Sequence, residues 1–167
     1  MQLDRLRLIA LKEEDLTGAL ENYQKMQLAL GLKPSDSPLD DEMRYAMKVR
    51  LKKVQEDLAN YKWLTNWAIV HHEANQIIGY IMIKGLPNTL GEVIIGYGID
   101  EAYQKQGYAK EAVAGLKQWI FENPDAKAII ADTEKENVAS HRVLQSLGAF
   151  NYKENDELIW WKLERSI

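Results

Sequence analysis

One stretch of the chain, residues 96–112, joins a strand end, a polar loop and a helix start in a way that suits anion binding. At such a junction the first N–H groups of the helix lack partners within it, and the helix dipole adds positive potential. Gly107 leaves the backbone open to a ligand because it has no Cβ, and Lys105 and Lys110 add positive charge. The stretch therefore predicts an anion site, commonly filled by phosphate, although an ordinary strand-to-helix turn has the same spacing.

Two common nucleotide motifs are missing from this stretch. The pair Gly96-x-Gly98 would need a third glycine at position 101 to match the dinucleotide fingerprint, and Glu101 stands there. The pattern Gly-x-x-x-x-Gly-Lys-Ser/Thr occurs nowhere in the sequence. Binding of a dinucleotide or a nucleoside triphosphate through such loops is therefore disfavoured.

Two segments resemble the general N-acetyltransferase (GNAT) superfamily. The first matches that family's pattern Gln/Arg-x-x-Gly-x-Gly/Ala and reads Gln104-Lys105-Gln106-Gly107-Tyr108-Ala109. The second begins at Asn137 and contains Ser140. It is similar to the Asn-x-x-Ser-x-x-Val-Leu-x-x-x-Gly-Phe segment of the branch that includes the ribosomal-protein N-terminal (Rim-type) acetyltransferases, with Ala149 inserted before the phenylalanine. The resemblance covers essentially the whole chain and is weakest over residues 31–62.

This resemblance implies a fold, a co-substrate and a set of binding residues. The implied fold is a single α/β (α+β) domain over residues 1–167, with a mixed, mostly antiparallel central sheet flanked by helices on both faces. The implied co-substrate is acetyl-CoA, with the loop amides holding its pyrophosphate and the backbone of the preceding strand pairing with its pantetheine arm. The residues implied to bind it are Tyr97, Gly98, Ile99, Gln104, Lys105, Gln106, Gly107, Tyr108, Ala109, Lys110, Asn137 and Ser140.

Acyl transfer from a thioester to an amine makes three demands on a site. The amine must be neutral, its proton must leave as the bond forms, and the developing oxyanion must be stabilised. A backbone N–H between residues 97 and 99 is expected to donate to the thioester oxygen. Glu92 is the first candidate for the base because it shares a strand face with Gly96 by parity, although a solvated residue at a strand end fits equally well.

Ser140 is the second catalytic candidate. Many relatives carry a tyrosine seven residues after the asparagine, which protonates the departing CoA thiolate, and Leu144 stands at that position here. A thiolate with a pKa of about 8.5 is a fair leaving group, and Ser140 could donate a hydrogen bond to the sulfur. A serine near a helix start is often a cap, so both roles stay open.

The composition excludes several chemistries. The chain has no cysteine, which rules out a thiol nucleophile, thiolate zinc and disulfides and favours direct transfer in a ternary complex. It has 21 Lys+Arg against 25 Asp+Glu and a net charge of −4, so a broad basic face for nucleic acid is not expected. The charged amino terminus lacks a signal-type apolar region, and no apolar run approaches the roughly 20 residues that span a bilayer. We therefore expect a cytoplasmic protein with no membrane, nucleic-acid or metal partner, as a monomer or a homodimer.

Resemblance and composition together predict an N-acetyltransferase that moves an acetyl group from acetyl-CoA directly to a primary amine. The acceptor is a small molecule or a protein N-terminus, and the sequence does not separate the two. Leu144 motivates an alternative, a catalytically weak acyl-CoA-binding or regulatory module on the same fold. A small-molecule binding protein unrelated to CoA is a third hypothesis.

Hydrophobic spacing predicts the elements that precede the site. A strand near residues 3–9 leads into a helix capped by Asp15 that ends near Gly31. A long amphipathic helix follows over residues 43–61. Its exposed face is expected to carry Lys48, Arg50, Lys52 and Lys53. Tyr23, Tyr45 and Met47 from these helices are candidate walls of an acceptor cleft.

The remaining spacing predicts the elements that carry the site. Three antiparallel strands between residues 67 and 99 are followed by a helix over residues 109–120 and a short strand at 128–131. Asn137 is expected to cap a last helix, with Gly148 just beyond its end and a closing hairpin after it. His71 and His72, beside a hairpin turn, and His141 are expected to face solvent.

Overall fold

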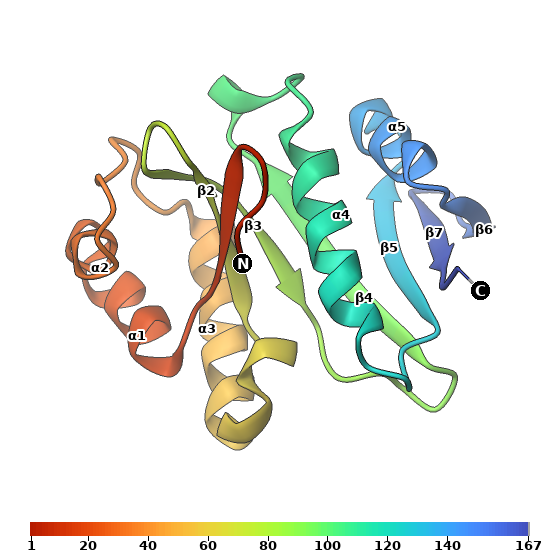
Figure 1. The fold of residues 1–167 in the computed structure, drawn as a ribbon, viewed down its shortest axis with the longest axis horizontal. Coiled ribbons are helices and arrows are strands. Elements are labelled where there is room, and N and C mark those ends of the chain that lie inside the picture. Colours follow the sequence, from red (N-terminus) through yellow and green to blue (C-terminus); the bar gives the residue numbers. More distant parts are fainter. Residues whose placement is uncertain (167) are drawn as a thin grey trace.

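The computed structural model describes residues 1–166, which form one seven-stranded sheet with helices on both faces (Figure 1). The strands are β1 (Leu6–Ala10), β2 (Asn66–His71), β3 (Gln76–Ile83), β4 (Glu92–Ile99), β5 (Ala128–Glu134), β6 (Phe150–Glu154) and β7 (Leu158–Glu164). The helices are α1 (Glu13–Glu21), α2 (Tyr23–Ala29), α3 (Asp41–Glu56), α4 (Tyr108–Phe121) and α5 (Val138–Ser146), with short 3₁₀ turns η1 (Leu58–Trp63) and η2 (Glu101–Tyr103). The predicted mixed α/β class with strands in the middle of the chain is confirmed.

The sheet has the order β1-β2-β3-β4-β5-β7-β6. Every neighbouring pair is antiparallel except β4 and β5, which run parallel. The predicted three-strand meander corresponds to β2, β3 and β4. The parallel pair is joined through α4, as a parallel connection requires a crossover.

The parallel pair is short, and this shortness creates an opening in the sheet. β4 and β5 pair only from Glu92↔Ala128 to Ile94↔Ile130. Beyond that point β4 continues to Ile99 on β3, while β5 continues to Glu134 on β7. The two strands therefore part toward the carboxyl end of β4, where their facing edges no longer bond each other.

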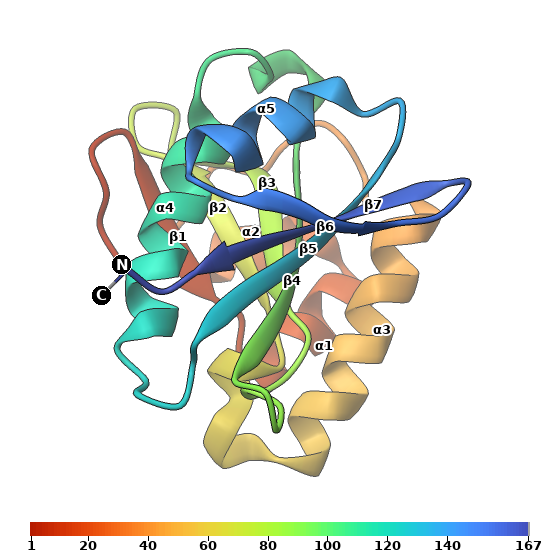
Figure 2. The same ribbon diagram turned by 90° about the vertical axis from the view of Figure 1, so that its right-hand side faces the viewer.

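Two hydrophobic clusters cover the two faces of the sheet. One packs α4 and α5 against the sheet, with Leu116 and Ile120 fully buried, as the spacing of the 109–120 helix predicts. The other packs α1, α2 and α3 against the opposite face, with Met47 and Val54 fully buried. Figure 2 shows α4 on one side of the sheet and α3 on the other. Met47 is therefore a core residue and not a cleft wall.

The start of the first helix differs from the prediction. Lys12 is the residue before α1, and the Asp15 carboxylate accepts from the Lys12 N–H at 2.9 Å, so Asp15 lies in the first turn. The expected single helix to Gly31 is divided at Asn22, whose side chain accepts from the Lys25 N–H and starts α2. The spacing of the apolar residues does not reveal this second helix cap, because the cap depends on a local hydrogen bond of the Asn22 side chain.

Arg50 on α3 is the clearest departure from the predicted helix faces. The residue is 8% exposed, and its guanidinium donates to the carbonyls of Leu64 (3.3 Å) and Ile83 (3.1 Å). Burial lowers the pKa of this guanidinium from its usual value. Lys48, Lys52 and Lys53 are exposed as predicted.

Residues 1–166 show neither a membrane-spanning helix nor a metal-binding cluster. None of the helices there combines the length and apolar character needed to cross a bilayer. Nor do three or more His, Asp or Glu side chains in that range converge as a metal site would require.

Candidate active site

A cavity of about 540 Å³ lies where β4 departs from β5. It is bounded by the end of β4, the 104–107 loop, the first turn of α4 and the first turns of α5. Its lining residues are Tyr97, Gly98, Ile99, Tyr103, Gln104, Lys105, Gly107, Tyr108, Ala109, Lys110, Asn137, Ala139, Ser140, Arg142 and Val143. The structure thus brings every residue expected to bind acetyl-CoA, except Gln106, to one cavity.

The cavity is a positively charged site on an acidic chain. Lys105, Lys110 and Arg142 line it, and none of its lining residues within the described chain is Asp or Glu. The whole chain carries a net charge of −4, so this concentration of cations is local. Such a site favours an anionic ligand, since cations without carboxylate partners raise the local positive potential.

The loop before α4 has a backbone shape that opens its amides to a ligand. Lys105 and Gly107 both take left-handed conformations, with φ of 62° and 83°. The first helical hydrogen bond runs from the Glu111 N–H to the Gly107 carbonyl at 3.1 Å. The N–H groups of residues 107–110 have no acceptor within residues 1–166. This helix start can therefore hold an anion through several N–H groups at once.

Tyr97 places a hydroxyl group at the wall between β4 and α5. Its side chain is half-buried, and its hydroxyl donates to the Ser140 carbonyl at a long 3.5 Å. Burial raises the pKa of Tyr97, and the contact with Ser140 offsets part of that rise. The hydroxyl accordingly keeps its proton at neutral pH.

The start of α5 supports the capping role for its asparagine. The Asn137 side chain accepts from the Ser140 N–H at 3.2 Å, as predicted. This contact uses the backbone of Ser140, and its hydroxyl has no hydrogen-bond partner among the described residues. Leu144, at the position of the tyrosine in many relatives, is 2% exposed and packs in the core. It offers no proton donor to the cavity.

Glu92, the predicted base, lies away from the cavity. It begins β4, where Lys162 Nζ approaches its carboxylate at 3.3 Å and the Asn88 side chain donates to it at 3.4 Å. Tyr97 lies five positions further along the strand, about 17 Å away at the usual rise per residue. Parity gave the face of the strand and not the position along it. Glu92 does not line the cavity, and its role as the base stays a prediction.

His71 does not face solvent as expected. Its Nδ1 accepts from the Ala74 N–H at 3.1 Å, so the proton of the neutral ring is on Nε2 and is donated to the Tyr108 hydroxyl at 3.0 Å. His141 is also tethered, with Nε2 3.0 Å from the Glu134 carbonyl oxygen. His72 is exposed. Tyr108, a residue of the cavity wall, is thus held from behind by a histidine on β2.

Four lining residues were missed by the sequence reasoning, namely Tyr103, Ala139, Arg142 and Val143. Val143 follows Ser140 by three residues and shares its face of α5, a signal that helical spacing carries. Arg142 and Ala139 flank that face. Tyr103 belongs to η2, whose turn depends on a Tyr103 N–H bond to the Asp100 carbonyl that no local pattern predicts.

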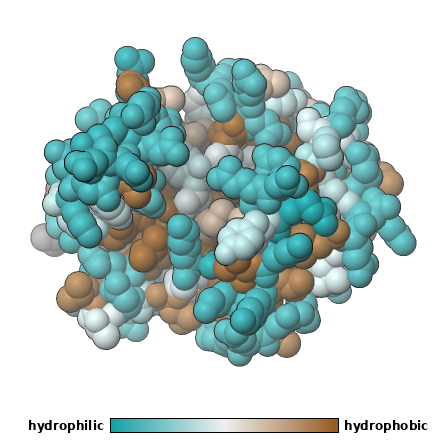
Figure 3. Space-filling model, turned by 180° about the vertical axis from the view of Figure 1, so that it is seen from behind, coloured by the Kyte–Doolittle hydropathy of each residue, from teal (hydrophilic) through white to brown (hydrophobic). Residues whose placement is uncertain are grey.

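The sheet face opposite α4 offers a second approach to the end of β4. Tyr80 pairs with Gly98 across the strands, and no described atom lies within 4 Å of the position that a Cβ on Gly98 would take. The Tyr80 hydroxyl is 2.7 Å from that of Tyr23, and burial raises the pKa of Tyr23 to about 12. Figure 3 shows this side of the molecule, with apolar side chains in a furrow between hydrophilic projections.

Comparison with known proteins identifies the family. Residues 5–149 match the family described as "Acetyltransferase (GNAT) domain". The chain therefore belongs to the GNAT acetyltransferase family.

Two relatives from Bacillus subtilis (strain 168) are uncharacterized N-acetyltransferases. YjdG is 28% identical over 100 residues, which cover 59% of this chain and 60% of YjdG. YnaD is 35% identical over 54 residues, 32% of each chain. The matched regions span less than two thirds of either relative.

Solved structures share the fold at low sequence identity. The ribosomal-protein-S5-alanine acetyltransferase from Vibrio fischeri has a TM-score of 0.72 at 19% identity, covering 98% of this chain and 95% of its own. The ribosomal L7/L12 α-N-protein acetyltransferase RimL, in complex with coenzyme A, has a TM-score of 0.67 at 16% identity, covering 96% and 94%. At these identities the similarity concerns the fold.

Proposed function

We propose that the chain is an acetyl-CoA-dependent N-acetyltransferase that acts on a primary amine. The observation that carries the proposal is the cationic cavity at the parting of β4 and β5, into which the helix start of α4 presents unpaired N–H groups. Family membership and the coenzyme A complex of a protein with the same fold support it.

The residues of the cavity fit the chemistry of coenzyme A. Its phosphates need cations and N–H donors, which Lys105, Lys110, Arg142 and the first turn of α4 supply. Its extended pantetheine arm carries amide groups that need backbone partners. The edge of β4 beyond Ile94, which β5 leaves unpaired, can provide them.

In the proposed reaction, acetyl-CoA supplies an acetyl group activated as a thioester. A backbone N–H of residues 97–99 donates to the thioester oxygen as negative charge develops on it. The amine approaches from the open side of Gly98 as its neutral form, beside the Tyr23–Tyr80 pair. The N–C bond forms, the C–S bond breaks, and the amine proton leaves to water.

The sulfur keeps the bonding electron pair and needs a proton or a hydrogen bond. Ser140 lines the cavity with a hydroxyl free of other partners among residues 1–166, so we assign it the donor role. The Tyr97 hydroxyl, on the facing wall, is a second donor that remains protonated at neutral pH because burial raises its pKa.

Acetyl transfer to a small-molecule amine or to a protein N-terminus is consistent with this site. The solved relatives named above act on ribosomal proteins by their names, and we extend to this chain only the amine class of acceptor. The alternative, a weak acyl-CoA-binding module, is favoured by Leu144, which removes the usual tyrosine.

Thiol release separates the two functions. The chain is mixed with acetyl-CoA and a panel of polyamines, amino acids, amino-bearing antibiotics and peptides, and free thiol is measured alongside calorimetric CoA binding. We expect CoA binding and thiol release above the hydrolytic background with at least one amine. CoA binding without turnover on any amine would favour the module, and absence of CoA binding would overturn both.

A further inference from the structure

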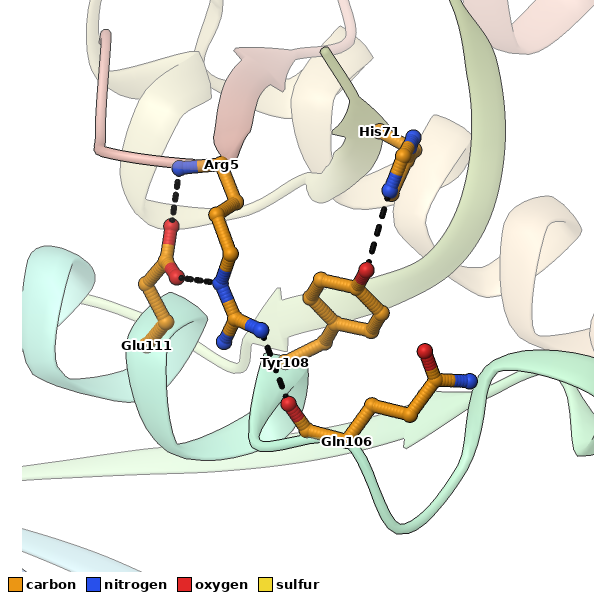
Figure 4. A network of polar contacts seen from close by, with 5 residues as sticks. All are labelled: Arg5, His71, Gln106, Tyr108 and Glu111. Atoms are coloured by element: carbon orange, nitrogen blue, oxygen red, sulfur yellow. Dashed lines mark hydrogen bonds and ion pairs between the residues drawn. The ribbon is translucent and has the colours of Figure 1, made fainter. Parts of the chain in front are cut away.

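A cluster of polar residues from three distant segments lies behind the 104–107 loop (Figure 4). Arg5, just before β1, binds Glu111 of α4 twice, through its backbone N–H and through Nε, both at 2.8 Å. Its Nη1 donates to the Gln106 carbonyl at 2.9 Å, and its guanidinium lies 4.4 Å from the centre of the Tyr108 ring. The amino-terminal segment thus contacts the loop, the first helical turn and the cavity wall.

The contact with Gln106 has a directional consequence for the loop. In a trans peptide the C=O and the following N–H point in opposite directions. Because Arg5 draws the Gln106 carbonyl toward itself, the Gly107 N–H is turned away from Arg5. Gly107 lines the 540 Å³ cavity, and a Cβ there would lie 3.2 Å from Arg5 Nη2. Gln106, whose carbonyl Arg5 binds, is the one expected residue that does not line the cavity.

Arg5 is placed to orient the loop and not to contact an anion in it. It does not line the 540 Å³ cavity but a separate one of about 420 Å³ on the far side of Tyr108. Its charge is paired with Glu111, which reduces its attraction for a distant phosphate. Tyr108, whose ring lies between Arg5 and the Nε2 of His71, forms a wall shared by both cavities.

We propose that Arg5, held by Glu111, is a positioning residue that keeps the 104–107 loop in the shape that binds the pyrophosphate of CoA. The proposal rests on the proposed function. A residue outside the cavity would then determine the selectivity for acyl donors that carry a pyrophosphate. That residue lies about one hundred positions before the loop in the sequence.

The test compares donors with and without the pyrophosphate. In the Arg5→Ala variant we expect the Kd for CoA and the KM for acetyl-CoA to rise about tenfold, as for loss of one charge-assisted hydrogen bond, with kcat changed less than about twofold. With S-acetylpantetheine, which lacks the pyrophosphate, kcat/KM stays at the wild-type value. Arg5→Lys should restore part of the affinity, because a lysine keeps the ion pair with Glu111. It should not restore all of it, because an ammonium group lacks the forked guanidinium that also reaches the Gln106 carbonyl.

Lys162→Ala is the matched control, since it removes the ion pair of Glu92 with Lys162 at the other end of β4. We expect its CoA affinity to equal that of the wild type. Wild-type affinity in Arg5→Ala, or an equal loss with both donors together with a lowered Tm, would overturn the positioning role. A wild-type chain that does not bind CoA would instead contradict the proposed function.

Discussion

The two ends of β4 have opposite characters. At its start, Glu92–Ile94 pairs with β5 on one side, and Glu92 is neutralised by Lys162. At its end, residues 97–99 have β3 on one side only, and the other side opens on a cavity lined by three cations. This difference supports placing the proposed site at the end of β4, because the hydrogen-bond ladder with β5 stops there and leaves backbone groups free to bind a ligand.

The largest expected effect comes from filling the helix start of α4. Gly107→Val adds a branched side chain at a φ of 83°, beside the cavity and against Arg5. We expect CoA affinity to fall about a hundredfold or more, measured by calorimetry, because the loop amides lose their arrangement.

Gly31→Val is the matched control for that substitution. Gly31 has a similar φ of 76°, with no described atom within 4 Å of its Cβ position. It carries a comparable backbone strain of about 1–2 kcal/mol away from the cavity, so Tm should fall while the CoA affinity is kept. An equal loss of CoA affinity in both variants would contradict the assignment of the 104–107 loop as the pyrophosphate site.

The catalytic contrast between the two ends is tested by a pair of substitutions. Ser140→Ala should lower kcat about tenfold with little change in KM, the loss of one hydrogen bond in the transition state. It keeps the helix cap, because Asn137 bonds the Ser140 backbone. Glu92→Gln should leave kcat and its pH profile unchanged. If kcat fell in Glu92→Gln and not in Ser140→Ala, the catalytic group would lie at the start of β4 and not beside the cavity.

The cations at the open end give a smaller, salt-dependent effect. Lys110→Ala and Arg142→Ala should each weaken CoA binding about fivefold at low ionic strength, with a smaller ratio at high salt because exposed charges are screened. Lys52→Ala on the solvated face of α3 serves as the control. Affinities that do not depend on salt in any variant would contradict an electrostatic phosphate site.

The Tyr23–Tyr80 pair beside Gly98 predicts an effect on stability at high pH and none near neutrality. Burial raises the pKa of Tyr23 to about 12, so between roughly pH 10 and 12 the unfolded chain releases a proton that the folded chain retains. The free energy of unfolding should therefore fall as pH rises through this range.

The matched comparison for this prediction is a tyrosine that is exposed. Tyr23→Phe should make the fall between pH 8 and pH 11 shallower by about 1.4 kcal/mol, and denaturant unfolding at these two pH values measures it. Tyr45→Phe, at a residue 71% exposed, should leave the slope as in the wild type. An unchanged slope in Tyr23→Phe would refute the buried hydroxyl pair.

The sequence predicted the elements on both faces of the sheet because apolar spacing reports burial. It also predicted the loop and Asn137, because glycine, lysine and capping residues have local causes. It did not reveal the partners of Glu92, Arg50 and His71, which lie elsewhere in the fold and leave no local trace in the sequence. Arg5 belongs with them, since its contacts to Gln106 and Glu111 exist only once β1 lies beside α4.

An NMR titration of the ¹⁵N-labelled chain with CoA tests the proposed binding site most directly. We expect the largest shifts in the amide spectrum at Gly98 and at residues 107–110, and no shift at Gly31 and Gly91. A spectrum unchanged by CoA, or one whose shifts gather at the Glu92 end of β4, would contradict the claim that the open end of this strand is the binding site.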